Sequence, residues 1–334
     1  MTGHATATAP IFIIGNPRSG TTLLRLMLTC HPHIVVPPEA GFAVNLMPAH
    51  AGFRGAPGEL EHFLSDLLAS PKFEHWQLAR PVLETYLRET VAPRDYASLV
   101  AGVYACYGAV HQPGKPRWGD KNNFYLAHIP ALATLFPEAR FVHIVRDGRD
   151  VACSYRSLAN VKGKYAPTLP SATFDAVYQW RGNLRRIQRS FAAIGWSRVH
   201  ELRYEDLVRD PKGTLVRACE FLGEDFAPAM LESDRENRNR QLEPREFDAW
   251  KRRNQEGIDA SAIGRWESEL SPDDAQLAHL AGGDMLRHYR YASAHPVGAR
   301  IWIRYAVRVI SHEASRWLGR ARRRVAIRAT SSSA

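Results

Sequence analysis

The feature that most constrains the fold of this chain is a short, wholly apolar stretch near its start, followed by a glycine-bounded loop. Residues 11–14 read Ile-Phe-Ile-Ile, the loop runs from Gly15 to Gly20, and the apolar residues of 21–28 predict a helix. A strand with no polar face suits a sheet that is buried on both sides, as parallel sheets are. Strand, loop and helix in this order predict the opening unit of a parallel α/β fold.

The same succession recurs further along the chain. Residues 140–145 predict a strand before a helix at 151–158, and 199–203 predict a strand before a helix at about 205–222. Three strands separated by helices favour a parallel sheet with crossover connections. The chain between the first two predicted strands is expected to be mostly helical, with runs at about 59–69, 82–90, 95–111 and 123–136.

Two later stretches are polar. Residues 159–171 form a Pro/Gly-containing segment, and residues 233–262 are rich in charged side chains and look too hydrophilic for a core. Long polar loops inside an enzyme domain are commonly lids or binding loops. We therefore expect both stretches to lie at the surface beside a site.

The loop after the first strand has the spacing of a phosphate-binding loop. It reads Gly-Asn-Pro-Arg-Ser-Gly-Thr-Thr over residues 15–22, which fits G-x-x-x-x-G between a strand and a helix. Backbone N–H groups and the helix dipole favour an anion there. Enzymes that use nucleoside triphosphates carry a lysine where Thr21 stands, together with a Mg²⁺ site. The cation of this loop is instead Arg18, and the structural alternative is a turn that only connects strand to helix.

Several motifs carry a family resemblance. Residues 17–24 resemble the 5′-phosphosulfate loop of sulfotransferases that use 3′-phosphoadenosine 5′-phosphosulfate (PAPS), and residues 145–154 resemble the 3′-phosphate motif of the same family. Shorter matches lie at 118–121, 203–207 and 263–266. The motifs follow the family's order over about residues 10 to 270, and their residue pattern is most similar to that of the tyrosylprotein and carbohydrate-type sulfotransferases. The resemblance implies an α/β fold with a P-loop NTPase-like parallel sheet flanked by helices, helical insertions and a basic C-terminal helix.

The resemblance also implies how PAPS is bound, with no metal. By this resemblance Arg18 would clamp the 5′-phosphate, and Arg146 and Ser154 would hold the 3′-phosphate. Tyr204 would contact the adenine, and Arg265 would lie in a segment that closes over the donor. The alternatives are a surface ion pair for Arg18, a charged helix-capping turn with Asp147 or Asp150 as caps around Arg146, and a core tyrosine. The complete implied set is Pro17, Arg18, Ser19, Gly20, Thr21, Thr22, Arg146, Ser154, Tyr204 and Arg265.

Sulfuryl transfer needs cations at the leaving oxygen and a base on the acceptor hydroxyl. Arg18 and Lys121 are the expected catalytic cations, although Lys121 also fits a solvated loop lysine. Many small-molecule sulfotransferases use a histidine where Asn123 stands, and an amide cannot abstract a proton. Glu39 aligns with the glutamate base of the tyrosylprotein type, and its alternative is a glutamate at a helix start. His31 precedes a proline in a turn and is discounted as the base.

The excess positive charge lies at the C-terminal end. Of the formal net charge of +10, residues 298–334 carry +8, from nine arginines and one acidic residue, Glu313. Arg300, Arg304 and Arg308 recur every four residues among apolar and aromatic side chains. A basic amphipathic helix with tryptophan suits an anionic membrane surface, and the alternative is a docking helix with solvated arginines. Because no nucleic-acid recognition motif accompanies the charge, we expect no nucleic-acid partner.

The sequence therefore predicts a PAPS-dependent sulfotransferase domain over residues 1–297 and a basic extension over 298–334. The expected acceptor bears a hydroxyl group and is a carbohydrate, a lipid, a peptidyl tyrosine or a small metabolite. Alternatives are a P-loop kinase using ATP and Mg²⁺, or an inactive basic protein bound to membranes. Four dispersed cysteines and the lack of a secretory start or an apolar span lead us to expect a cytoplasmic protein, associated with the inner membrane surface through its basic end.

Overall fold

A computed structural model of the chain describes residues 9–248, 257–291 and 297–314. Its contacts group the chain into two units. The first unit comprises Met1–Arg146, Asn160–Thr168 and Gly182–Ile263, and the second comprises Asp147–Ala159, Leu169–Arg181 and Gly264–Ala334.

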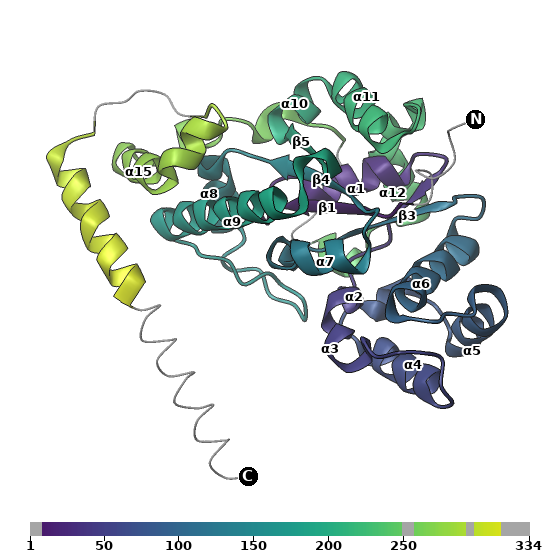
Figure 1. Cartoon of the computed structure of the whole chain (residues 1–334). Coiled ribbons are helices and arrows are strands. Elements are labelled where there is room, and N and C mark those ends of the chain that lie inside the picture. The colour runs from purple at the N-terminus through teal and green to yellow at the C-terminus, as the bar shows by residue number, and fades with distance from the viewer. Residues whose placement is uncertain (1–8, 249–256, 292–296, 315–334) are drawn as a thin grey trace, which may run out of the picture. The chain divides into compact units, whose positions relative to one another are not determined.

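The first unit is built on a five-stranded sheet in the order β2-β3-β1-β4-β5, with every neighbouring pair parallel (Figure 1). The predicted parallel α/β fold is therefore confirmed. The sequence predicted three of the strands and missed the other two, one very short and one polar. The strands are β1 (Ile11–Gly15), β2 (Ile34–Val35), β3 (Arg117–Lys121), β4 (Arg140–Val145) and β5 (Val199–Arg203).

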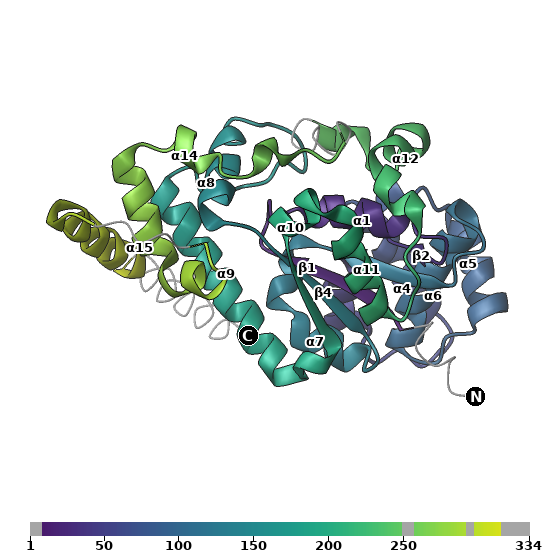
Figure 2. The same cartoon turned by 90° about the horizontal axis from the view of Figure 1, so that it is seen from above.

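Helices cover both faces of this sheet, as the apolar β1 requires (Figures 1 and 2). Alternate residues of β1 point to opposite faces. Ile11 and Ile13 belong to a core cluster with α1 (Thr21–Thr29), α10 (Tyr204–Arg209) and α11 (Pro211–Leu222). Phe12 points the other way and its ring packs against Trp118, Tyr125, Phe136 and Phe141. Helix α7 (Ile129–Leu135) lies on that side.

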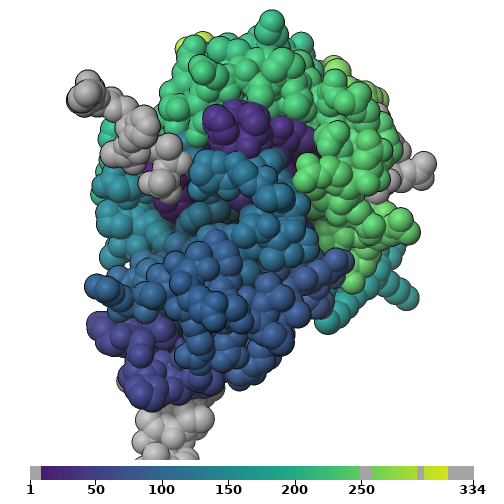
Figure 3. All heavy atoms as spheres, turned by 90° about the vertical axis from the view of Figure 1, so that its right-hand side faces the viewer, coloured from purple at the N-terminus to yellow at the C-terminus, as the bar shows by residue number. Residues whose placement is uncertain are grey.

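Three of the four predicted helical runs lie between β2 and β3, and the fourth follows β3. Figure 3 shows the part between β2 and β3 as a continuous surface, coloured dark blue to blue, on the lower half of the face in view. Near the second predicted run an α-helical turn passes into a π-helix, and the fourth run is divided. The elements are α2 (Phe42–Asn45), α3 (Met47–His50), α4 (Glu59–Ala69), η1 (Phe73–Trp76), α5 (Arg80–Thr85), η2 (Tyr86–Val91), α6 (Tyr96–His111) and, after β3, η3 (Asn123–Ala127).

The polar stretch 233–262 is not wholly a surface loop, and here the expectation was wrong. It contains α12 (Ser233–Arg240), η6 (Arg245–Phe247) and η8 (Ala260–Ala262). Glu243 is buried and pairs with the buried Arg25 of α1 at 2.5 Å. Arg25 also donates to the carbonyl oxygen of Val36 at 2.9 Å. The charge of Glu243 is tolerated in the interior because Arg25 pairs with it. The hydrophilicity of the segment alone does not reveal such a partner.

The second unit is helical. It includes α8 (Gly148–Ser157), the first part of α9 (Thr173–Ile194), α14 (Trp266–Glu269) and α15 (Pro272–His288). Residues 299–314 are also helical, which confirms the predicted basic C-terminal helix over its described part. Ile301 of this helix is buried, and Arg304 pairs with Asp273 at 2.7 Å. Among the described residues, no helix has the length and hydropathy needed to cross a bilayer.

Candidate functional site

The glycine-bounded loop joins β1 to α1 in the way that an anion site requires. Gly20 precedes α1 with φ of 93°, and a Cβ there would lie 2.5 Å from a ring carbon of Tyr204. No side-chain hydrogen bond caps the helix. The Oγ of Ser19 is buried and has no hydrogen-bond partner within the part of the chain that the structure describes. An orphaned buried hydroxyl beside an uncapped helix N-terminus fits an anionic group of a ligand.

The predicted base and the predicted catalytic lysine lie in direct contact. Glu39 follows β2, Lys121 ends β3, and both side chains are buried. The ammonium of Lys121 donates to Oε1 of Glu39 and also, at 3.1 Å, to Oγ1 of Thr22 at the start of α1. Lys121 therefore connects the carboxylate to the glycine-bounded loop, and the alternative of a solvated loop lysine is wrong. Parallel strands bring these groups together because their carboxyl ends share one edge of the sheet.

A second lysine, Lys72, contacts the same carboxylate and was missed by the sequence analysis. Its ammonium lies 2.8 Å from Oε2 of Glu39. Lys72 immediately precedes η1 and has φ of 69°. Its neighbours, Pro71 and Phe73, form no motif that would have pointed to a site. Glu39 thus has one ammonium on each oxygen, which favours its ionised form.

Behind Lys121 lies a buried carboxylate, Asp120, which belongs to the quoted motif at 118–121. Its Oδ2 accepts hydrogen bonds from the hydroxyls of Tyr104 and of Tyr125, the latter at 2.6 Å. Its Oδ1 accepts from the backbone N–H of Lys121 at 2.7 Å and from Asn122 at 2.9 Å. Burial raises the pKa of Asp120 to about 6. These bonds fix the end of β3 and so the position of Lys121.

Arg146 and Tyr204 form a second group beside the loop. The guanidinium of Arg146 donates to the carbonyl oxygens of Arg18, at 3.1 Å, and of Ala262, at 2.5 Å. Its central carbon lies 4.6 Å from the ring centroid of Tyr204. Arg18 itself has φ of 69°. The structure thus brings Arg146 and Tyr204 into contact with each other and with the loop that carries Arg18.

Ser154, Asp150 and Arg265 belong to the second unit. Ser154 is buried on α8, and Asp147 caps that helix by accepting from the N–H of Arg149 at 2.9 Å, as expected for a cap. Asp150 accepts from the backbone N–H groups of Gly264, at 2.9 Å, and Trp266, at 3.1 Å. Arg265 pairs with Glu269 at 2.6 Å. Asp150 thereby fixes the backbone of the segment that carries Arg265.

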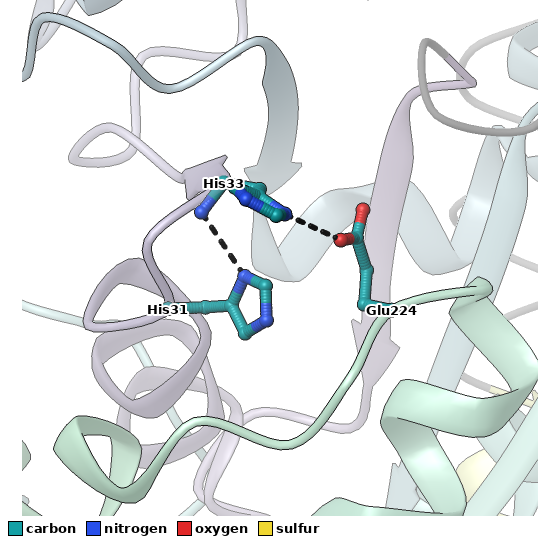
Figure 4. A group of neighbouring side chains, drawn as sticks. All are labelled: His31, His33 and Glu224. Carbon is teal, nitrogen blue, oxygen red and sulfur yellow. Dashed lines mark hydrogen bonds and ion pairs between the residues drawn. The ribbon is translucent and has the colours of Figure 1, made fainter. Parts of the chain in front are cut away.

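His31 and His33 lie close to Glu224, a grouping that their separation in sequence did not suggest (Figure 4). Nε2 of His31 contacts the carbonyl oxygen of Asp225 at 2.8 Å, and Nδ1 accepts from the backbone N–H of His33 at 3.1 Å. Glu224 contacts His33 at 3.0 Å and the buried Arg117 at 3.2 Å. Burial lowers the pKa of His31. Both ring nitrogens of His31 are therefore engaged in backbone contacts, one within its own turn and one with Asp225. These contacts agree with a structural role for His31.

The chain is similar to known sulfotransferases. Residues 10–228 match the model of the sulfotransferase family. The omega-hydroxy-beta-dihydromenaquinone-9 sulfotransferase Stf3 of Mycobacterium tuberculosis is 29% identical over 245 residues, 65% of this chain and 63% of that protein. Protein-tyrosine sulfotransferase 2 of Gallus gallus is 26% identical over 224 residues, 66% of this chain and 53% of that protein. The chain therefore spans less than two thirds of the length of these curated relatives.

A solved structure extends the likeness to the fold. The sulfotransferase domain from the Synechococcus PCC 7002 olefin synthase superposes with a TM-score of 0.55 at 25% identity, covering 86% of this chain and 97% of that domain. The matched family region contains the glycine-bounded loop, Glu39, Lys121, Arg146 and Tyr204, and it ends before Arg265.

Proposed function

The chain belongs to the sulfotransferase family, and we propose that it is a PAPS-dependent enzyme that transfers a sulfuryl group to an acceptor hydroxyl. The observation that carries this proposal is the contact chain from Glu39 through Lys121 to Thr22. It joins a carboxylate that can accept a proton to a cation at an anion-binding loop. These are the two groups that sulfuryl transfer requires of a protein.

Donor binding is assigned to the loop and its neighbours. The uncapped start of α1 and the buried hydroxyl of Ser19 support a 5′-phosphosulfate site in the loop formed by Pro17, Arg18, Ser19, Gly20, Thr21 and Thr22. Arg146 and Ser154 are assigned to the 3′-phosphate, Tyr204 to the adenine and Arg265 to the segment that covers the donor, on the strength of the motifs. The positively charged groups assigned to the site are arginine and lysine side chains, and the proposal includes no metal.

The chemistry follows from the positions of Glu39 and Lys121. Bound PAPS supplies the sulfuryl group and leaves as the 3′,5′-bisphosphate. Glu39 accepts the proton of the attacking hydroxyl, so that the acceptor oxygen can form its bond to sulfur. Lys121, together with Arg18, balances negative charge that builds on the phosphate oxygen as the old S–O bond breaks. Burial of Glu39 and Lys121 strengthens both interactions, because the local dielectric constant is lower than in water.

Two substitutions test this assignment. Glu39→Gln should abolish turnover and leave the affinity for 3′,5′-bisphosphoadenosine nearly unchanged, whereas Arg146→Ala should weaken that affinity. The measurements are transfer of labelled sulfate from PAPS and calorimetric titration with the bisphosphate. Tight binding of ATP·Mg²⁺ without any response to the bisphosphate would instead support the P-loop kinase alternative. Normal turnover by Glu39→Gln would remove Glu39 as the base.

The acceptor is assigned only by class. The two curated relatives are named for a hydroxylated menaquinone and for protein tyrosine, and both are hydroxyl-bearing molecules. We keep carbohydrate, lipid, peptidyl tyrosine and small metabolite as the candidates. A screen of cell extracts with mass-shifted sulfate from PAPS would identify the product directly.

We further propose that residues 1–297 form the sulfotransferase domain and that 298–334 attach it to an anionic membrane surface on the cytoplasmic side. The helix over 299–314 exposes large apolar side chains at Trp302, Ile303, Val307 and Ile310. Exposed Arg300 and Arg308 lie on the same helix. Residues 315–334, with most of the remaining arginines, lie outside the described residues. This combination of apolar and basic side chains supports binding to anionic lipid.

Vesicle pelleting tests the membrane proposal with the full chain. Phosphatidylglycerol vesicles should bind the protein, and the double variant Ile303→Asp, Ile310→Asp should bind them several-fold more weakly, with unchanged bisphosphate affinity. Undiminished binding by the double variant would remove the exposed helix face as the anchor.

A further inference from the structure

We propose that Lys72 is a positioning residue for Glu39, which keeps the carboxylate ionised and oriented when Lys121 is engaged by the sulfuryl donor. The inference rests on the proposed function and deepens it, because it assigns separate tasks to the two lysines that share one carboxylate. Lys72 would also connect the base to two segments that the sequence predicted to be binding loops.

The two lysines are not equivalent. Lys121 contacts Oε1 of Glu39 and the Thr22 hydroxyl, so it lies between the base and the glycine-bounded loop. Lys72 contacts Oε2 of Glu39 at 2.8 Å, and its other described contacts are with Tyr165 and Phe247 and not with residues of that loop. A phosphosulfate group in the loop would share the Lys121 ammonium with Glu39, and its negative charge would offset the positive charge that Lys121 presents to the carboxylate. Lys72 remains as the counter-charge that a buried carboxylate needs.

The surroundings of Lys72 hold its ammonium at this position. Its backbone N–H donates to the hydroxyl of Tyr165 at 3.1 Å. The ammonium lies 5.6 Å from the ring centroid of Tyr165 and 5.5 Å from that of Phe247, within the range of cation–π attraction. Trp76, at the end of η1, donates from its ring N–H to the carbonyl oxygen of Pro38 at 2.9 Å. Because Pro38 directly precedes Glu39, the turn carrying Lys72 and the segment carrying Glu39 are joined twice.

The aromatic neighbours of Lys72 come from both polar stretches. Tyr165 lies in the 159–171 segment and Phe247 in the 233–262 segment. Tyr165 is itself held by a 2.7 Å hydrogen bond from its hydroxyl to Glu74. An acceptor that displaces either ring would change the surroundings of Lys72 and, through it, the charge balance at Glu39. The base thereby becomes sensitive to the two segments that the sequence predicted to be lids or binding loops.

The pH profile of turnover distinguishes this role from a structural one. Among the described contacts, the charged groups that face Glu39 are Lys72 from the turn before η1 and Lys121 from β3, with Asp120 behind Lys121. Loss of one cation makes protonation of the carboxylate easier. Lys72→Met should therefore move the acid limb of the kcat profile to higher pH by about one unit, a roughly tenfold loss of rate on that limb. Lys72→Arg should restore the limb.

Lys164→Met provides a matched control. Lys164 lies 4.7 Å from the same Tyr165 ring and pairs with Glu74 at 2.7 Å, without a contact to Glu39 among the described interactions. Its removal should leave the acid limb in place. Bisphosphate titration checks that each variant is folded, and Lys72→Gln is measured in the same way if Lys72→Met does not fold.

The outcomes separate the two proposals. An acid limb that stays at the wild-type pH in folded Lys72→Met, or in Lys72→Gln in its place, overturns the role of Lys72 and leaves the sulfotransferase assignment intact. If Glu39→Gln retains turnover, the proposed base itself fails, whatever Lys72 does. A shift that appears equally in Lys164→Met would show that disturbance of Tyr165, and not loss of the Lys72 charge, moves the limb, and would also overturn the inference.

Discussion

The neighbouring strands β1 and β3 are equally buried and have opposite chemical character. Their register pairs Ile11 with Gly119, Phe12 with Asp120 and Ile13 with Lys121. Every residue of both strands is buried. In β1 burial follows from apolar side chains. In β3 three of the five residues, Arg117, Asp120 and Lys121, are charged, and specific partners hold them in the interior.

The partners in β3 show what such burial requires. Arg117 donates to the carbonyl oxygens of Ala9, at 2.8 Å, and Leu222, at 2.6 Å. Asp120 accepts four hydrogen bonds, and Lys121 binds Glu39 and Thr22. An unpaired buried charge would shift its protonation or unfold the chain. Apolar strands therefore supply stability without detailed placement of their neighbours, whereas a polar strand such as β3 depends on that placement and can present reactive groups.

The largest expected effect is on stability, in β1. Ile13→Ala removes buried methyl groups from the core cluster beside α1, where Ile13 is 1% exposed. We expect the free energy of unfolding to fall by about 2–5 kcal/mol, measured by chemical denaturation. Turnover per folded molecule should stay near the wild-type value, since Ile13 carries no reactive group. A loss below about 1 kcal/mol would contradict the view that β1 acts mainly through apolar burial.

Lys121, which pairs with Ile13 in the register of β1 and β3, should affect turnover more than stability. Lys121→Met keeps the length of the side chain and removes its charge. We expect kcat to fall by about 10²–10³, or roughly 2.7–4 kcal/mol in transition-state stabilisation, because one cation near the leaving oxygen is lost. The free energy of unfolding should change less than in Ile13→Ala, because Glu39 keeps its contact with Lys72.

Sulfate transfer and denaturation measured on the same preparations separate the two effects. If Lys121→Met turns over normally but unfolds as easily as Ile13→Ala, Lys121 is a structural lysine and the contrast between the strands fails.

The same contrast explains what the sequence could predict. The apolar strands β1 and β4 and the loop beside β1 were recognised because burial and glycine spacing leave a local signal. Strand β3 was missed because its burial depends on partners such as Glu224 and Glu39, which lie 107 and 82 residues away in the sequence. Strand β2, with only Ile34 and Val35, is too short for a periodic pattern.

The candidate site divides in a similar manner. Glu39 and Lys121 were selected by motif, and the structure adds that they touch. Lys72 had no motif, and its role depends on a turn with positive φ and on aromatic rings from two later segments. The error over residues 233–262 has the same origin, since Glu243 is buried only because Arg25 pairs with it. Side chains that act through distant partners are recognised only once the fold is known.

The smallest expected effect concerns Asp120, the register partner of Phe12. Burial raises its pKa to about 6 in the folded protein, against about 3.9 for an unperturbed aspartate. The folded state therefore binds the proton more tightly than the unfolded state does. The stabilising contribution of this proton is complete below the unfolded pKa and is lost as the pH rises through about 6. The difference in pKa corresponds to about 3 kcal/mol.

Denaturation at a series of pH values from 4 to 7 measures this contribution. Relative to Asp120→Asn, which has no group to titrate, the wild type should lose about 2 kcal/mol of its free energy of unfolding as the pH rises over that range, because at pH 4 the aspartate of the unfolded chain is already about half ionised. Phe12→Leu is the control across the register, and its curve should run parallel to that of the wild type. If the curves of the wild type and Asp120→Asn are also parallel, the hydrogen bonds from Tyr104, Tyr125 and Asn122 balance the effect of burial on the pKa. Asp120 would then titrate like an ordinary aspartate, and the buried charges of β3 would not make the free energy of unfolding depend on pH.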